Sequence, residues 1–117
     1  MIIKTGSVDA KVVTTSWTNM FTYEIPQDGI YLIWGKGTRA NNSPDGLLVG
    51  LRFRLDSVLI DETLVPSVPN YVGNHENIAT LFSVAKCTAG QSLTIDEKKD
   101  RNYGPNLGLD YTIAKIY

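Results

Sequence analysis

Few side chains in this 117-residue chain have the type and spacing that catalysis requires. The single histidine, His75, lies in the polar stretch Gly73-Asn74-His75-Glu76-Asn77, where it could act as a base or a metal ligand. A catalytic base needs a nucleophile and an orienting partner, and the sequence offers neither. The single cysteine, Cys87, ends an apolar run, so we expect a buried or half-buried thiol of ordinary reactivity. We therefore predict no catalytic, cofactor-binding or metal-binding residues, and we expect a protein that is not an enzyme.

A charged stretch, Asp96-Glu97-Lys98-Lys99-Asp100-Arg101-Asn102, carries carboxylate and amide oxygens of the kind that hold calcium. Its spacing is not that of an EF-hand loop, and its three basic residues would oppose a bound cation. Charged side chains of this kind are almost always exposed, so the better interpretation is a solvated loop.

Two arginines, Arg52 and Arg54, share one face of the alternating segment 48–55. One interpretation is that they face solvent. The other is that they make polar contacts between subunits, since arginine is enriched at interfaces. The sequence leaves both alternatives open.

Two long polar stretches, Thr63–Asn77 and Asp96–Gly108, contain the residues that best suit ligand binding. Long loops in a small domain are usually functional or disordered. Tyrosine offers a flat apolar face with a polar tip, and asparagine both donates and accepts hydrogen bonds. We therefore expect a neutral glycan to contact Tyr71, Asn74, Tyr103 or Asn106. The alternative is that these loops pack on a neighbouring subunit or fibre.

Composition narrows the class of protein. Hydrophobic residues make up 43% and charged residues 20%, which is typical of one globular domain spanning 1–117. The formal net charge of -1 gives no broad basic field that would attract nucleic acid. No apolar run approaches the length of a membrane span, and Met1-Ile2-Ile3-Lys4 does not begin a signal peptide. We expect synthesis in a cytoplasm and no membrane insertion.

Short runs rich in Val, Ile, Thr, Tyr and Phe, separated by Gly, Pro, Asn and Asp, predict an all-β sandwich. Turns are expected at Pro26–Gly29, Asp56-Ser57 and Thr88–Gln91. The expected strands are 8–13, 17–25, 30–34, 48–55, 58–60, 78–87, 92–95 and 109–116, with polar loops over 35–46, 63–77 and 96–108. About eight strands in one small domain favour a jelly roll or a related sandwich. The predicted core comprises Tyr31, Ile33, Val49, Leu51, Phe53, Phe82, Val84, Leu93 and Ile95.

Three segments carry a family resemblance. Tyr23-Glu24-Ile25-Pro26-Gln27-Asp28-Gly29-Ile30-Tyr31-Leu32-Ile33 resembles the aromatic-x-x-Pro-x-x-Gly-x-Tyr-x-Phe signature of the complement globular-head and tumour-necrosis-factor (TNF) superfamily. Leu55-Asp56-Ser57-Val58-Leu59-Ile60 is similar to the hairpin of that superfamily, and Ala89-Gly90-Gln91-Ser92-Leu93-Thr94-Ile95 to its Ala-Gly-Asp-x-Val strand entry, with Gln91 in place of Asp. The closing Phe-x-Gly-x-Leu motif has only a loose echo in Leu107-Gly108-Leu109, which suits the viral and bacterial relatives better than the animal branch.

The resemblance implies a ten-stranded jelly roll that trimerises through its inner sheet and that binds rather than catalyses. The viral relatives form trimeric knobs on phage fibres and capsids. It therefore implies a virion structural or adhesion protein at the virion surface, as a head-fibre or tail-fibre component. The partners implied are a homotrimer, other virion proteins and a host cell-surface glycan. Both a small capsid-surface protein and an isolated fibre-head fragment fit this interpretation.

The segment 30–34 is apolar at every position, although a strand with one wet face should alternate. We expect Tyr31 and Ile33 to enter the core and the alternate residues to pack on neighbouring subunits, because such a surface left in water favours aggregation. The predicted subunit interface is Ile30, Leu32, Trp34, Tyr111 and Tyr117.

Two other interpretations remain from the sequence. One is a monomeric β-sandwich that binds carbohydrate, which the same strand pattern fits. The other is a metalloenzyme on a jelly-roll barrel, but such metal sites usually need several histidines and this chain has one.

Overall fold

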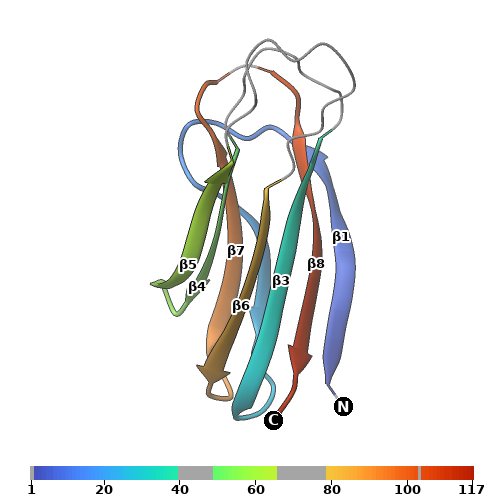
Figure 1. The fold of residues 1–117 in the computed structure, drawn as a ribbon, viewed down its shortest axis with the longest axis vertical. Helices are drawn as coiled ribbons and strands as arrows, with labels where there is room; N and C mark the ends of the chain where they lie inside the picture. Colours follow the sequence, from blue (N-terminus) through green and yellow to red (C-terminus); the bar gives the residue numbers. More distant parts are fainter. Residues whose placement is uncertain (1, 40–48, 66–78, 103) are drawn as a thin grey trace.

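The structure is a computed structural model that describes residues 2–39, 49–65, 79–102 and 104–117. Eight strands form two layers packed face to face (Figure 1). The strands are β1 (Ile3–Lys11), β2 (Thr18–Glu24), β3 (Gly29–Arg39), β4 (Val49–Leu55), β5 (Val58–Val65), β6 (Thr80–Cys87), β7 (Ser92–Lys99) and β8 (Leu107–Lys115). The predicted all-β sandwich is confirmed.

The strand order identifies the architecture. One sheet has the order β1-β8-β3-β6 and the other β2-β7-β4-β5. The first strand therefore pairs with the last, the second with the seventh, the third with the sixth and the fourth with the fifth, all antiparallel. This is one long antiparallel hairpin rolled into two sheets, which is a jelly roll. The described residues contain eight strands, whereas the resemblance implies ten.

The predicted turns are present. Asp56 and Ser57 connect β4 and β5 with φ of 48° and 68°, both in the left-handed region that the favoured two-residue hairpin requires. Gly90 has a φ of 90° in the turn before β7, where the backbone nitrogen of Gln91 donates to the carbonyl of Thr88 at 3.1 Å. These turns fix the register of the strands they join.

The strand β3 runs five residues past its predicted end, through a segment expected to be loop. The two glycines of this extension, Gly35 and Gly37, suggested a loop, but both face the interior of the sandwich. A side-chain carbon on Gly35 would come within 3.1 Å of the Phe53 ring, and one on Gly37 would overlap the carboxyl group of Glu97. Glycine is therefore required here for packing between the sheets and not for a turn.

The strand β7 also continues beyond its predicted end, through the charged residues Asp96 to Lys99. These residues alternate between the two faces of the sheet. Glu97 and Lys99 point inward and are buried, while Asp96 points outward against two arginines. The expected solvated loop is thus wrong for 96–99, because pairing with β2 and β4 and local ion pairing outweigh the charge of the segment.

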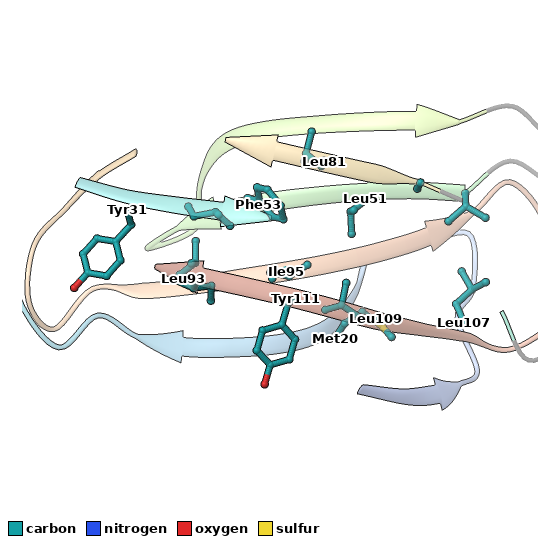
Figure 2. Close-up of a cluster of buried hydrophobic side chains, with 14 of the residues drawn as sticks. Met20, Tyr31, Leu51, Phe53, Leu81, Leu93, Ile95, Leu107, Leu109 and Tyr111 are labelled. Carbon is teal, nitrogen blue, oxygen red and sulfur yellow. The ribbon is translucent and has the colours of Figure 1, made fainter. Parts of the chain in front are cut away.

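Most of the predicted core lies between the two sheets (Figure 2). The confirmed buried residues are Tyr31, Ile33, Val49, Leu51, Phe53, Leu93 and Ile95. The prediction is wrong for Phe82 and Val84, which are 57% and 53% exposed. The alternation of β6 was predicted correctly, but the opposite row, which contains Leu81 and Cys87, faces the core.

Candidate functional site

Each sheet has one face in the core and one face outward. We call the outward surface of β1-β8-β3-β6 the β3 face and that of β2-β7-β4-β5 the β7 face. The strand register determines which side chains meet on each surface, because directly opposed residues lie on the same side of a sheet.

The β3 face carries a continuous apolar patch across three strands. Trp34 lies opposite Phe82 of β6 and Thr112 of β8, and Leu32 lies opposite Val84 and Ala114. The patch consists of Ile30, Leu32, Trp34, Phe82, Val84 and Ala114. Phe82 and Val84 are the most exposed of these.

Toward β1, Ile3 lies opposite Ala114 and is 56% exposed, and the neighbouring positions on this face are polar. Thr5 and Thr112 approach through their hydroxyl oxygens at 3.0 Å, and the Ser7 hydroxyl donates to Asp110 at 2.7 Å. Lys36 lies opposite Asp110 in the register. The β3 face therefore has an apolar centre and a hydrogen-bonded polar border, which resembles the anatomy of protein interfaces.

The predicted interface residues fall in different places. Ile30, Leu32 and Trp34 are half-buried on the β3 face. Tyr117 is 86% exposed at the end of the chain.

Tyr111 does not face outward, which corrects its assignment to the subunit interface. Figure 2 shows Tyr111 within the cluster of buried side chains. It is only 6% exposed, its ring stacks on Phe21 at 4.0 Å between ring centroids, and it lies over Gly6 of β1. Tyr111 shares the inward side of β8 with Leu109 and Ile113, an alternation that the sequence itself contains. The interior of the sandwich occupies this side chain and leaves almost none of it for a neighbouring subunit.

The β7 face is polar and centres on Asp96. This carboxylate is 1% exposed and accepts hydrogen bonds at Oδ2 from Arg52 Nε at 2.7 Å and from Arg54 Nε at 3.0 Å. Asn19 donates to its other oxygen at 3.3 Å. The two arginines thus lie on an outward face and pair within their own chain.

An indole ring extends this polar cluster. The guanidinium carbon of Arg52 lies 4.4 Å from the centre of the Trp17 ring, and the ammonium nitrogen of Lys98 lies 4.7 Å from it. A shallow pocket of about 250 Å³ beside the ring is lined by Trp17, Glu62, Thr63 and Lys98. Sequence reasoning missed this cluster, because Trp17 and Lys98 are far apart in the chain and only the register of β2 on β7 brings them together.

A buried acid lies inside the sandwich. Glu97 is 0% exposed, and neither of its carboxyl oxygens has a hydrogen-bond partner among the described residues. Desolvation raises the pKa of Glu97 to about 8, against a smaller opposing effect of the Lys11 charge. Glu97 is therefore mostly neutral at pH 7. Sequence reasoning missed this buried acid, because the segment was expected to be a solvated loop.

The remaining candidate residues show no feature of a functional site or lie outside the described residues. Cys87 is buried as expected, and burial raises the pKa of its thiol. Asn106 is exposed in the connection between β7 and β8. Tyr71, Asn74, His75 and Tyr103 fall outside the described residues. Within the described ranges, no three His, Cys, Asp or Glu side chains gather as a metal site would require.

Comparisons with known proteins identify no family. No family model and no curated protein matches the chain. Among solved structures, rabbit GITRL is 12% identical with a TM-score of 0.49, covering 88% of this chain and 78% of that one. A family 35 carbohydrate-binding module from Clostridium thermocellum is 14% identical with a TM-score of 0.48, covering 97% and 91%. The module CBM6cm-2 of Cellvibrio mixtus lichenase 5A, in complex with cellotriose, is 16% identical with a TM-score of 0.44, covering 98% and 88%.

All three TM-scores are below 0.5, so the jelly-roll assignment rests on the strand order of this chain. The described part of the chain includes no helix long and apolar enough to cross a membrane.

Proposed function

We propose that this protein is a non-enzymatic jelly-roll module that assembles with copies of itself through the β3 face and leaves its other surfaces free to bind a ligand. The observation that carries the proposal is the apolar patch of Ile30, Leu32, Trp34, Phe82, Val84 and Ala114. Contiguous exposed apolar surface of this kind marks an interaction site or an aggregation liability. A second copy of the chain covers it without requiring another partner.

The proposed assembly is a trimer. Its support is the resemblance of residues 23–33 to the TNF superfamily signature, since that superfamily trimerises through its inner sheet. Around a rotational axis each copy offers the same side chains, so an apolar centre with a polar border suits a closed ring. The threonine and serine hydroxyls on β1 and β8 supply hydrogen-bonding groups at the edge of the contact.

We further propose that the trimer is a knob on the surface of a phage virion, as a head-fibre or tail-fibre component. This step rests on the resemblance to viral members of the superfamily and on the weak match to the closing motif of the animal members. Display of three equal sites on one rigid body raises avidity without new contacts.

Measurement of mass in solution tests the assembly. The wild-type protein is expected at three times the 12.9 kDa of one chain by sedimentation equilibrium at micromolar concentration. Trp34→Glu places an unpaired charge in the contact, which costs several kcal/mol, so a folded monomer is expected. Val58→Glu is the matched control, because Val58 is an apolar side chain that is 69% exposed on the β4–β5 hairpin, away from the patch. A wild-type monomer would overturn the proposal.

A second candidate function is a monomeric carbohydrate-binding module. The observation that favours it is the pocket beside Trp17, since aromatic rings on polar surfaces are well suited to contact sugars. A wild-type monomer that binds a glycan would select this function over the assembly.

A further inference from the structure

We propose that the β7 face holds a binding site for an acidic saccharide, a sugar chain that carries carboxylate groups, with Trp17 and Lys98 as its principal contacts. The site lies on the opposite side of the sandwich from the β3 face, so the proposal does not depend on assembly.

The register of the sheet builds the site. Lys98 lies opposite Gly50 of β4, which has no side chain, and Trp17 immediately precedes β2 beside Lys98. The next row across the sheet contains Glu62 of β5, Arg52 of β4 and Asp96 of β7. The pocket of about 250 Å³ opens between the Trp17 and Lys98 side and the Glu62 side. Several strands of a sheet therefore hold its walls in place.

The charges that contact the indole ring are positive, and Glu62 is the one carboxylate among the described residues that line the pocket. Arg52 and Lys98 both lie within 5 Å of the centre of one indole ring, so two positive charges contact the same aromatic side chain. Asp96 is the ion-pair partner of Arg52, but Lys98 has no carboxylate partner within the described part of the chain. An anion beside Lys98 therefore gains attraction from a positive charge that no described carboxylate compensates.

The geometry of Arg52 leaves donors for such an anion. Asp96 accepts from Nε of Arg52, and Arg54 also uses its Nε on the same oxygen. Among the described residues, the bonds of Arg52 use only its Nε, so its terminal guanidinium nitrogens can donate to a second carboxylate. Asp96 accepts from Arg52 and from Asn19, so it holds the arginine in place, which lowers the entropy lost when a ligand binds.

The other walls favour a sugar. The exposed part of the Trp17 ring offers a flat apolar surface for the C–H face of a pyranose, and the carboxylate of Glu62 accepts hydrogen bonds from hydroxyl groups. The pocket is smaller than the 300–1,000 Å³ typical of drug-sized ligands, which suits roughly one sugar ring. These contacts together select a hexuronic acid residue within a longer chain. The sequence predicts a neutral glycan at the long loops, because the net charge of the chain is close to zero. A neutral glycan would gain nothing from the positive charge of Lys98 beside Trp17.

Isothermal titration with trigalacturonic acid tests the site, with galactotriose as the neutral probe. We expect the acidic trimer to bind, the affinity to fall as salt is raised, and the neutral trimer to bind at least tenfold more weakly. Trp17→Ala and Lys98→Met should each weaken binding at least tenfold, and Lys98→Arg should restore most of it. Lys4→Met is the matched control, since it removes the same charge from an exposed position on β1 and should leave affinity unchanged.

Three results would overturn the proposal: equal binding of the two trimers, acid binding that survives both Trp17→Ala and Lys98→Met, or no binding of either trimer at millimolar concentration. The same titration on the Trp34→Glu variant separates this site from the assembly. Retained affinity in a monomer supports a site contained within one chain, whereas affinity lost only on dissociation overturns it.

Discussion

The carboxyl group of Glu97 on β7 lies against the backbone of Gly37 on β3, in the space that a side chain at position 37 would fill. The two residues belong to different sheets, so this contact crosses the interior of the sandwich. An ionisable group is thus part of the packing between the two sheets.

Stability should fall as pH rises from about 4.5 to about 8. The pKa of Glu97 is about 8 in the folded protein, against 4.5 for the free side chain, so the folded state keeps a proton that the unfolded state loses in this range. The stabilisation relative to the high-pH limit is complete below 4.5 and is lost as pH passes 8, with an upper bound of about 5 kcal/mol. Urea unfolding at pH 5, 7 and 9 measures it.

Glu97→Gln should flatten this pH dependence and raise stability at pH 9. The comparison cancels the contributions of other groups, such as Lys99, whose pKa burial lowers. Glu24→Gln, at an exposed position on β2, is the control and should leave the profile unchanged. An identical slope in Glu97→Gln and wild type would show that Glu97 is not the titrating group.

Gly37→Ala should destabilise the fold by about 1–3 kcal/mol, the usual range for overpacking, because the new methyl group overlaps the Glu97 carboxyl. Glu97→Ala creates room at the same place, so the double variant should lose less than the sum of the single losses. Thermal unfolding of the four proteins gives the coupling, and strict additivity would mean that the two residues do not share the space.

Phe53→Ala should cost about 3–5 kcal/mol, since Phe53 is fully buried between the sheets. Phe82→Ala is the matched control and should cost far less in the unfolding of the Trp34→Glu monomer, because Phe82 faces outward. In the wild-type background, Phe82→Ala should instead weaken self-association. Equal losses for the two substitutions in the monomer would mean that the assigned faces of β6 are wrong.

Ser57→Gly should stabilise the protein by about 0.5–1 kcal/mol, because a residue other than glycine is strained at a φ of 68°. Asp56→Gly relieves similar strain at its neighbour but removes the hydrogen bond from the backbone nitrogen of Ser92 to Asp56 Oδ1 at 2.8 Å, so its gain should be smaller or absent. Chemical denaturation ranks the two variants, and a loss of stability in Ser57→Gly would argue against the turn geometry.

The sequence predicted the class of fold because its strand signals are local. Alternation over 48–55 placed Leu51 and Phe53 in the core without knowledge of the partner strands. Alternation does not tell which of two rows faces inward when both are apolar. In β6 the larger side chain, Phe82, suggested the wrong row, and only pairing with Trp34 resolves it.

The candidate sites were less predictable because they depend on contacts between distant segments. The charges over 96–99 indicated a loop. In the structure, however, Asp96 forms ion pairs with two arginines of β4, which lie more than forty residues earlier in the chain. Trp17 gives no signal by itself in a polar stretch. Trp17 can be recognised as part of a candidate site only once the fold brings Lys98 and Arg52 to its ring.

The strand pairing also has a consequence for how the chain folds. The hydroxyl of Thr5 bonds to the carbonyl of Tyr111, 106 residues away, and the whole of β1 depends on β8 for its hydrogen-bonded partners. The β4–β5 hairpin is the most local pairing in the topology, so loop-closure entropy must be overcome before most of the sheet forms. High contact order slows folding, so we expect refolding on the millisecond-to-second scale typical of sandwiches. During synthesis on the ribosome β1 cannot find its partner until β8 has emerged, so the sheet β1-β8-β3-β6 and its outward β3 face are completed last.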